Sequence, residues 1–532
     1  MKNATIYYLH ITETNSKVIQ KYKCYENAMI INGLSFGKTY QWKVVAYNRN
    51  TPVDSTGTFT FTVAGSELTN TSHYRLKLNH IDTGIDSNEL ILIDYNRIAV
   101  NRMGTPIWYI PEIKNKIDFK ERIRDLKITK DGTFTLLNNK SALECDINGK
   151  IIWEAPEINK TPKDSGSFYH HCFSKLNNGN YMVLGMRYTY KKIPSEFKDK
   201  FKSSQNLKEI NGSTHIRVEY GIIYEFSPDK KLVWSWDSQD HISDEDIFSH
   251  GNADTLTNPG PHMNSFDYNE AKDIVAVGFR DLSRICIIDK KTGKVVNSFG
   301  ETLPSGDVTT SINFKFQHDS RFTKKGDIAI FNNNEIFQKK DSVSSVIVFN
   351  PKSKKVEWSF KCDFDSLANG KSFKGGSVSE LKNGNFLVSM GHLNRLFEVT
   401  RSKTIVWDGF YERFSPSENK WISYPQYRIS YASSLYPYKF GVSITEESNP
   451  KECRLMVKVA NIGSEKDSYK ISVKDEKGAV IKEVNTNLVS SGESNTANFK
   501  IVIKKYSITK NIFIEIQSLS NKNIAKKVVI SR

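Results

Sequence analysis

The chain has 532 residues, too many for one ordinary hydrophobic core, so two to four domains are expected unless one repeat domain absorbs most of the length. Aromatic residues make up 12%, which suits sheets, and 75 Lys and Arg against 59 Asp and Glu give a net charge of +16. This charge favours anionic ligands. The lack of a basic helix or arginine-rich tract argues against nucleic acid, and the lack of an apolar run of about 18 residues argues against a membrane span.

Cysteine usage excludes some classes of site. The six Cys are scattered and form no CxxC pair, so neither a zinc site nor a redox motif is expected, and disulfides cannot be paired from the sequence. The first eight residues lack the apolar stretch and small-residue cleavage site of a signal peptide.

Residues 1–66 alternate between apolar and polar positions, which predicts strands. The stretch Leu34–Tyr47 resembles the later strands of a fibronectin type III sandwich, whereas the early strands are not recognisable. We therefore expect a small, incomplete β-sandwich at 1–66, with Met1 lying inside a longer natural chain.

Two phrases recur through the middle of the chain. The first is a polar turn, a β-branched pair and then Trp or another aromatic; its copies are 146–153, 228–234, 291–296, 351–358 and 402–407, with a looser copy at 101–108. The second is a hairpin turn followed by an apolar strand, at 130–134, 177–184, 325–331 and 382–388. Each repeat thus holds about four strands, the size of one propeller blade, and counting the turns gives six repeats over roughly residues 75–435.

A closed ring protects the sheet edges that an open array would expose. We therefore predict an all-β chain with a six-bladed β-propeller at 67–439. Residues 440–532 also alternate, with Asn, Gly and Ser turns, and predict a C-terminal β-sandwich. Neither flank concentrates reactive side chains, so we expect the flanks to serve packing or spacing.

The histidines follow the repeat. The chain has only 11 His, and His170, His171, His262 and His318 stand a few residues before the first hairpin turn of three different repeats. Arg280 lies on the strand after the second of these segments. Because the inner strands of a propeller face its central channel, we expect these side chains to converge, although burial in a core is the commoner outcome for any single His.

Clustered His also suit a metal ion. However, no HExxH or paired-carboxylate spacing accompanies them, and Asn264 and Arg280 are poor companions for a cation. The planar donors of Arg match tetrahedral oxyanions such as sulfate or phosphate. The pattern indicates an anion site, and we expect no metal and no cofactor.

Several motifs in order carry a resemblance. They are His262-Met263-Asn264-Ser265, Gly278-Phe279-Arg280, Ile288–Lys294, Phe316–Arg321, Ile330–Asn333 and Tyr427–Ser430. With these motifs the chain resembles the arylsulfotransferase (aryl sulfate sulfotransferase) family over roughly residues 67–440. The resemblance implies a six-bladed propeller that moves a sulfuryl group from an aryl sulfate donor to a phenolic acceptor, without a nucleotide donor and through a sulfohistidine.

The resemblance also implies roles for single residues. His318 would be the nucleophile. The residues that would surround the sulfuryl oxygens and the bridging phenolic oxygen are His262, Asn264, Arg280 and His171. Aligning the repeats on the turn favours His171 for this role, whereas aligning them on the preceding strand favours His170. Both residues therefore remain candidates. Aromatic residues such as Tyr169 are candidates for lining a phenol pocket, although packing within a blade is the commoner role of an aromatic residue.

Two positions depart from the family pattern. Cys172 stands where an Asp often follows the first His pair, and Asn332 stands where the phrase after the third His usually has Asp. If the missing carboxylate orients an imidazole, a weak sulfur donor in its place would lower activity.

Two other functions stay open. One is a non-catalytic propeller that binds an anionic or aromatic ligand, since fibronectin-like flanks are common in adhesive chains. The other is an aryl sulfate hydrolase, which uses the same residues with water as acceptor. The resemblance further implies a periplasmic or secreted location, and a homodimer is an open alternative for the oligomeric state.

Overall fold

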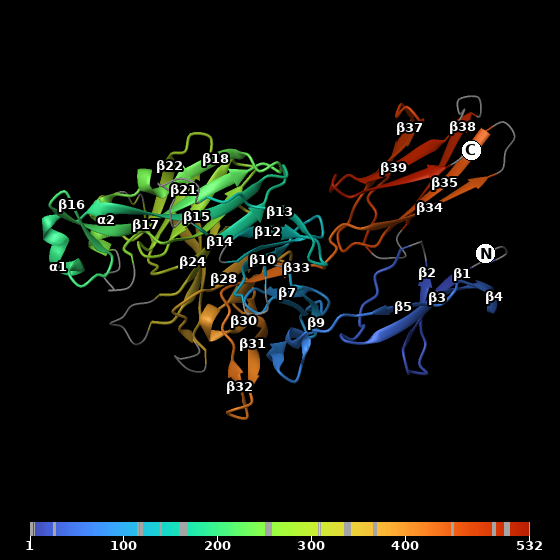
Figure 1. The fold of residues 1–532 in the computed structure, drawn as a ribbon, viewed down its shortest axis with the longest axis horizontal. Helices are drawn as coiled ribbons and strands as arrows, with labels where there is room; N and C mark the ends of the chain where they lie inside the picture. The colour runs from blue at the N-terminus through green and yellow to red at the C-terminus, as the bar shows by residue number, and fades with distance from the viewer. Residues whose placement is uncertain are drawn as a thin grey trace. The chain divides into compact units, whose positions relative to one another are not determined.

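A computed structural model gives the fold of the chain (Figure 1). It describes residues 4, 6–24, 28–113, 116–117, 121–138, 141–158, 168–250, 258–306, 308, 310–334, 342–364, 370–447, 452–491, 496–504 and 511–530. The chain divides into two compact units. One comprises Met1–Thr69, Thr129–Thr133 and Ser433–Arg532, and the other, called here the six-sheet unit, comprises Asn70–Ile128 and Phe134–Ala432. The predicted all-β class is confirmed.

The first unit contains an N-terminal sheet in the order β2-β1-β3-β4, with β5 pairing β3. Its strands are β1 (Ile6–Glu13), β2 (Gln20–Cys24), β3 (Thr39–Asn48), β4 (Thr51–Ser55) and β5 (Phe59–Thr62), followed by the short 3-10 helix η1 (Glu67–Thr69).

The C-terminal part of the same unit has two sheets, β34-β35-β38 and β37-β36-β39-β40. Their strands are β34 (Phe440–Glu447), β35 (Glu452–Asn461), β36 (Tyr469–Lys474), β37 (Val480–Asn485), β38 (Thr496–Lys504), β39 (Ile512–Ser518) and β40 (Ala525–Ile530). Side chains from both sheets, among them Val457 and Ile514, share one buried core.

The six-sheet unit is built from six sheets among the residues described, each with four main strands. The strands pair antiparallel, except that β23 runs parallel to β22. The first three are β33-β7-β8-β9, β10-β11-β12-β13, and β14-β15-β17-β16 with β18 on β17. Their strands are β33 (Ile429–Ala432), β7 (Leu90–Ile93), β8 (Ile98–Asn101), β9 (Pro106–Tyr109), β10 (Arg124–Ile128), β11 (Phe134–Leu137), β12 (Ala142–Cys145), β13 (Ile151–Glu154), β14 (Phe168–Lys175), β15 (Tyr181–Lys192), β16 (Leu207–Ile210), β17 (Ser213–Phe226) and β18 (Leu232–Asp237).

The other three sheets are β19-β20-β21-β22-β23, β24-β25-β26-β27 and β28-β29-β30-β31-β32, with β6 on β31. Their strands are β6 (Tyr74–Ile81), β19 (Met263–Asn269), β20 (Ile274–Phe279), β21 (Arg284–Asp289), β22 (Val295–Gly300), β23 (Thr310–Ser311), β24 (His318–Phe322), β25 (Ile328–Asn332), β26 (Ser345–Asn350), β27 (Lys355–Lys361), β28 (Ser377–Glu380), β29 (Phe386–Ser389), β30 (Arg395–Val399), β31 (Ile405–Ser415) and β32 (Lys420–Ser423).

Helices are few and short among the residues described: η3 (Ser195–Phe197), α1 (Lys198–Phe201), η4 (Ser238–Asp240), α2 (Asp244–His250) and η5 (Gly391–Leu393). Within this described part, no helix combines the length and the apolarity that crossing a bilayer requires. Five of the six cysteines are buried, and Cys24 is partly exposed.

The hairpin turns of the repeat follow from local chemistry. Gly132, Gly179, Gly326 and Gly384 hold the same place in four first hairpins, and each has a φ between 74° and 90°. A side chain at such a φ is strained, so glycine favours the turn there. The turn of the Trp phrase is also set locally. The Asp146 carboxylate accepts hydrogen bonds from the backbone N–H groups of Asn148 and Lys150.

The Trp of the repeated phrase joins one sheet to the next. Trp108, in the sheet of β7, donates its indole N–H to the carbonyl of Ile147 at 2.9 Å, in the turn between β12 and β13. Trp234 and Trp358 donate in the same way to the carbonyls of Lys290 and Arg401 in the following sheets. This shared hydrogen bond gives the phrase a structural reason to recur.

Trp407 makes the same bond from the last sheet back to the first. Its indole N–H donates to the carbonyl of Arg102 at 2.8 Å, and the Arg102 guanidinium lies 4.5 Å from the centre of its ring. The inner strands also contact one another in a closed order, β10, β14, β19, β24, β28, β33 and β10 again. One edge strand of each sheet thus lies at a shared centre (Figure 1).

Candidate functional site

The histidine segments lie on three of these inner strands, at points where the strand is irregular. The pairing register of β14 shifts between Tyr169 and Phe173, and that of β24 shifts between His318 and Arg321. His171 and His262 have left-handed φ values of 62° and 47°. A bulge re-aims the side chains around it and is common beside active sites.

Two imidazoles contact the ring of Tyr427, and a third contacts one of these two. The ring centroid of His171 lies 5.3 Å from that of His262 and 5.4 Å from that of Tyr427, and the ring centroid of His318 lies 6.0 Å from that of Tyr427. His318 and Tyr427 are buried. The structure therefore brings together one His from each of three sheets.

Between the two neighbouring histidines, His171 is the one in this cluster. The ring of His170 contacts Phe168 and His171, and its side chain is 1% exposed. The Nδ1 atoms of the two imidazoles face each other. The ring contacts of His170 are therefore with Phe168 and His171, whereas the ring of His171 also contacts His262 and Tyr427.

The proton on His318 is assigned by its neighbour Asn333. The Nδ2 group of Asn333 donates to the carbonyls of Ser372 and Gly375, both at 3.0 Å, so its Oδ1 is the atom that lies 2.7 Å from His318 Nδ1. An amide oxygen only accepts, so Nδ1 carries the ring proton. The Nε2 of His318 therefore keeps its lone pair.

Burial lowers the pKa of His318 well below its ordinary value, and the charge of Arg280 lowers it further, while the hydrogen bond to Asn333 opposes the change. Burial also lowers the pKa of His171 and of His170 well below the ordinary value. These three imidazoles are therefore neutral at neutral pH.

His262 has the opposite shift. Its burial favours the neutral ring, but the Glu219 carboxylate, whose Oε1 lies 3.1 Å from Nδ1, raises the pKa of His262 above its ordinary value, with help from Asp281. His262 side-chain exposure is 29%. The cluster thus sets an imidazole with a raised pKa beside imidazoles with lowered pKa values, an arrangement typical of acid–base pairs.

Arg280 lies beside this cluster because its strand pairs with the segment that carries His262. The backbone N–H of Arg280 donates to the carbonyl of His262 at 3.0 Å. Its guanidinium contacts Asp281 at 2.6 Å and lies 5.1 Å from the centre of the Phe316 ring. A fixed cation therefore stands close to His262 and His318.

Asn264 and Tyr169, which were also predicted as site residues, make contacts of other kinds. The Asn264 amide donates to the carbonyl of Gln317 at 2.8 Å, so it fixes the residue that precedes His318. Tyr169 packs in a core between sheets, and its hydroxyl donates to the carbonyl of Pro156. The structure does not bring Tyr169 to the histidine cluster.

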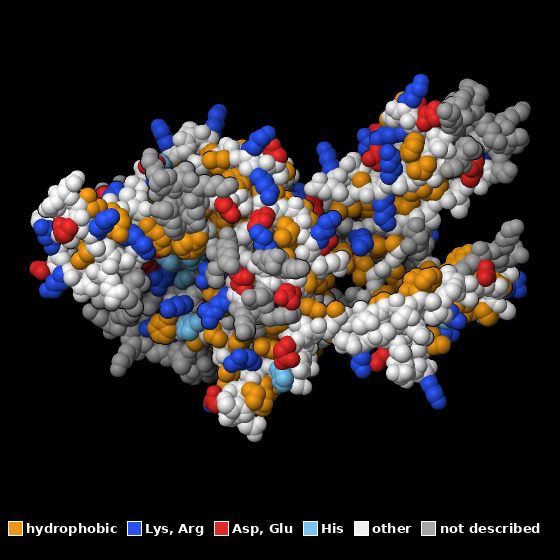
Figure 2. Space-filling view, viewed as in Figure 1, with side chains coloured by type: hydrophobic (Ala, Val, Ile, Leu, Met, Phe, Trp, Pro, Cys, Tyr) orange, Lys and Arg blue, Asp and Glu red, His pale blue; other side chains and the backbone are white. Residues whose placement is uncertain are grey.

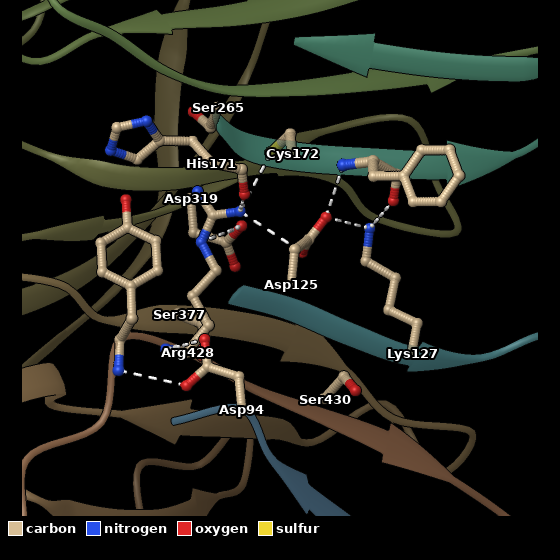
Figure 3. Close-up of polar contacts among 12 residues, drawn as sticks. Asp94, Asp125, Lys127, His171, Cys172, Ser265, Asp319, Ser377, Arg428 and Ser430 are labelled. Carbon is tan, nitrogen blue, oxygen red and sulfur yellow. Dashed lines mark hydrogen bonds and ion pairs between the residues drawn. The ribbon is translucent and has the colours of Figure 1, made fainter. Parts of the chain in front are cut away.

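Arg428 occupies the centre where the inner strands meet (Figure 3). Its guanidinium donates to the carbonyls of His171 at 2.9 Å and Asn264 at 2.6 Å. It also lies 3.5 Å from carboxylate oxygens of Asp125 and Asp319. One buried cation therefore ties four inner strands together below the histidines.

Both departures from the family pattern have a structural place. Cys172 Sγ lies 2.9 Å from Nη1 of Arg428, so the thiol faces the central arginine. Asn332 accepts the backbone N–H groups of Lys315 and Asn334 and donates to Ser345. Among the residues described, Asn332 makes no contact with His318.

The sequence reading gave no role to Glu219, Asn333 or Arg428. Asn333 and Arg428 lie inside the family motifs, so the motifs carried a signal for them. Glu219 lies in β17, far from His262 in sequence, and nothing local marks it. As for metals, no group of three or more His, Cys, Asp or Glu in the described ranges is arranged to hold an ion.

Comparisons with known proteins bear on this site. A model of the family described as Arylsulfotransferase (ASST) matches residues 132–413, which include every His of the cluster. No curated protein matches. Among solved structures, a protein of unknown function from Bacteroides caccae is 13% identical, with a TM-score of 0.38 and coverage of 68% of this chain and 98% of that chain.

A streptogramin B lyase is 9% identical, with a TM-score of 0.30 and coverage of 81% of this chain and 98% of that chain. Scores this low carry no argument about function. The family match extends over more than half of the sequence. The chain therefore belongs to the arylsulfotransferase family.

Proposed function

We propose that the six sheets are the blades of a six-bladed β-propeller that transfers a sulfuryl group from an aryl sulfate to a phenol through a sulfohistidine at His318. The closed order of the inner strands and the Trp407 bond from the last sheet to the first support the propeller. The bond between His318 and Asn333, which leaves a lone pair on Nε2, is the observation that carries the chemistry.

In the first step, the Nε2 lone pair of His318 attacks the sulfur, and the bond between sulfur and the phenolic oxygen breaks. The departing oxygen keeps that electron pair and takes a proton from His262, whose pKa is raised by Glu219. A neutral nucleophile and a protonated acid are both required here, and the lowered pKa of His318 and the raised pKa of His262 favour these two states.

In the second step, the hydroxyl of the acceptor phenol attacks the sulfur of sulfohistidine while neutral His262 takes its proton. The bond between Nε2 and sulfur breaks and returns the electron pair to His318. Sulfuryl transfer spreads charge over three oxygens, as phosphoryl transfer does, so fixed charge contributes much of the rate. Arg280 supplies that charge, and the His171 ring borders the same space.

The test is turnover of 4-nitrophenyl sulfate with phenol. Wild-type protein should release 4-nitrophenol and form phenyl sulfate, and His318→Ala should abolish both. Brief incubation with donor alone should add one sulfuryl group to the peptide that contains His318, detected by mass spectrometry. Binding of aryl sulfates without either product would instead favour the binding module.

The ratio of products separates transfer from hydrolysis. A transferase makes phenyl sulfate when phenol is present, whereas a hydrolase releases sulfate at the same rate with or without phenol. The limits 1–66, 67–439 and 440–532, the sandwich assignments of the flanks, the homodimer and the periplasmic or secreted location stay predictions.

A further inference from the structure

A cleft lies on the side of Tyr427 that is lined by Tyr95 and Lys374. Its volume is about 290 Å³. An engineered cavity of about 150 Å³ holds benzene, so this cleft has room for one substituted aromatic ring. All its lining residues belong to the six-sheet unit: Tyr95, Arg122, Lys374, Gly375, His392, Tyr424, Pro425, Gln426 and Tyr427.

The cleft borders the histidine cluster through two residues. Tyr427 forms part of its lining and also contacts the rings of His171 and His318. Gly375 lines it too, and its carbonyl accepts the amide N–H of Asn333, which in turn holds His318. Tyr427 and the hydrogen bond between Gly375 and Asn333 therefore link the cleft to His318.

Aromatic faces and an unused polar group suit a ring-shaped ligand. The rings of Tyr95 and Tyr427 stack with centroids 6.2 Å apart and planes 23° apart. The Tyr427 hydroxyl is buried and has no hydrogen-bond partner among the residues described. A buried hydroxyl left unpaired costs free energy, so a ligand that bonds it gains affinity.

The charge of the lining is one-sided. Arg122 and Lys374 are both exposed, and the Arg122 guanidinium lies 5.4 Å from the centre of the Tyr95 ring. No Asp or Glu lines the cleft, and within the described ranges neither cation forms an ion pair. Figure 2 shows Lys and Arg side chains gathered with His side chains in a hollow near β24 and β28.

His392 adds a donor to this lining. Its Nδ1 accepts the backbone N–H groups of Phe373 at 3.2 Å and Lys374 at 3.4 Å. Burial and the charge of Lys374 lower the pKa of His392, so the ring is neutral and its one proton sits on Nε2. The cleft thus offers two cations and one imidazole N–H.

We infer that this cleft binds the ring of the phenol and selects phenols that carry a second, anionic substituent such as a carboxylate, through Arg122 and Lys374. The inference rests on the proposed function. Arg280 already faces the site of sulfuryl transfer, so the cations of the cleft are available to a charge at the far end of the ring. The chemical class is a hydroxyaryl carboxylate or its sulfate ester.

The test compares 4-hydroxybenzoate with 4-hydroxybenzamide, a neutral acceptor of the same size, using 4-nitrophenyl sulfate as donor. We expect kcat/KM to favour the carboxylate by about tenfold or more, the effect of one charge-assisted hydrogen bond. The double variant Arg122→Gln/Lys374→Gln should reduce the ratio of the two acceptors to about one, whereas Lys325→Gln, which changes an exposed Lys in a distant turn, should keep it.

A binding measurement separates the two proposals. Calorimetry on the His318→Ala variant should show tighter binding of 4-hydroxybenzoate than of 4-hydroxybenzamide, and the double variant should lose that difference. Failure of every acceptor to give product, with this binding preference intact, overturns the sulfuryl transfer and keeps the cleft. Turnover with equal kcat/KM for the two acceptors, or a preference unchanged in the double variant, overturns the cleft assignment.

Discussion

Glu219 Oε1 lies 3.1 Å from Nδ1 of His262, on a strand of a different sheet from the one that His262 precedes. The two meet because Glu219 in β17 donates its backbone N–H to the carbonyl of Pro259, shortly before His262. The carboxylate forms an ion pair with the ring at Nδ1 and raises the pKa of His262, so we expect Nε2–H to be the proton that is donated. This pair gives the site its acid.

Replacing Glu219 by Gln should therefore move the pH profile. Loss of the carboxylate lowers the pKa of His262, so the alkaline limb of kcat/KM should shift to lower pH. The rate with phenyl sulfate should fall by roughly tenfold or more, which is part of the roughly 10²–10⁴-fold that general acid catalysis contributes, because the variant weakens the acid without removing it. The rate with 4-nitrophenyl sulfate should fall less, because nitrophenolate leaves without a proton.

Glu225→Gln is the matched control. Glu225 lies on the same strand and is buried, but it pairs with Lys290 at 2.9 Å, away from the histidines. Its substitution should leave the limb in place. The acid role of His262 would be contradicted if Glu219→Gln lost the same fraction of its rate with phenyl sulfate and with 4-nitrophenyl sulfate and kept the alkaline limb of kcat/KM in place.

The neighbouring asparagines Asn332 and Asn333 give a second test. In Asn333→Asp a carboxylate would face Nδ1 of His318 and raise its pKa, so the nucleophile would be protonated over part of the neutral range. We expect the acid limb of kcat/KM to move to higher pH. The measurement is the pH profile with 4-nitrophenyl sulfate and phenol.

Asn332→Asp restores the residue usual in the family and serves as the control. Its oxygen can still accept from Lys315 and Asn334, and Ser345 can donate in place of the lost amide. The acid limb should stay in place. If Asn333→Asp also leaves it in place, the assignment of the Nδ1 proton of His318 is wrong.

Sequence patterns predicted most of the strands because the turns are set locally. The recurring Gly and Asp residues determine hairpins within a few positions, and the Trp phrase enters one strand of each sheet at β9, β13, β18, β22, β27 or β31. The position of Tyr169 could not be read in this way. Strict alternation puts Tyr169 and His171 on one face, but the irregularity between Tyr169 and Phe173 breaks that alternation.

Long-range partners were beyond the sequence for a different reason. Glu219 and Arg428 act on residues of other sheets, and their sequence separations from those partners follow no period. Arg428 shows this most clearly, since it contacts His171 and Asn264, far earlier in the chain. Only the closing of the strands around one centre brings such groups together.

The neutral imidazoles predict acid sensitivity. The pKa values of His170, His171 and His318 are lowered in the folded state, so the unfolded chain binds more protons as pH falls below about 6.5. Stability should therefore decline below that pH, by at most about 1.4 kcal/mol per pH unit for each such ring. His262, with its raised pKa, contributes stability below pH 6.5 that is lost as pH rises through its folded value.

Urea unfolding followed by Trp fluorescence can measure this, because all Trp except Trp42 lie in the six-sheet unit. The urea concentration at the unfolding midpoint should decrease as the pH is lowered from about 7.5 to about 5.5. The decrease should be smaller in His170→Gln, because this variant removes one imidazole whose pKa is lowered by folding. Identical falls in both proteins would show that His170 takes up its proton without unfolding.

Arg428→Met should be the most destabilising of these changes. The variant leaves the carboxylates of Asp125 and Asp319 buried beside an apolar side chain, although Lys127 and Arg321 still pair with them. Removing one member of a buried charge network costs about 3–5 kcal/mol. Cys172→Ser keeps a small polar side chain beside Arg428 and should cost about 1 kcal/mol or less. Urea unfolding of both variants gives the free energies. If Arg428→Met costs no more than Cys172→Ser, then the strands meet without help from the central cation, and their own backbone pairing and packing are sufficient to hold the imidazoles in place.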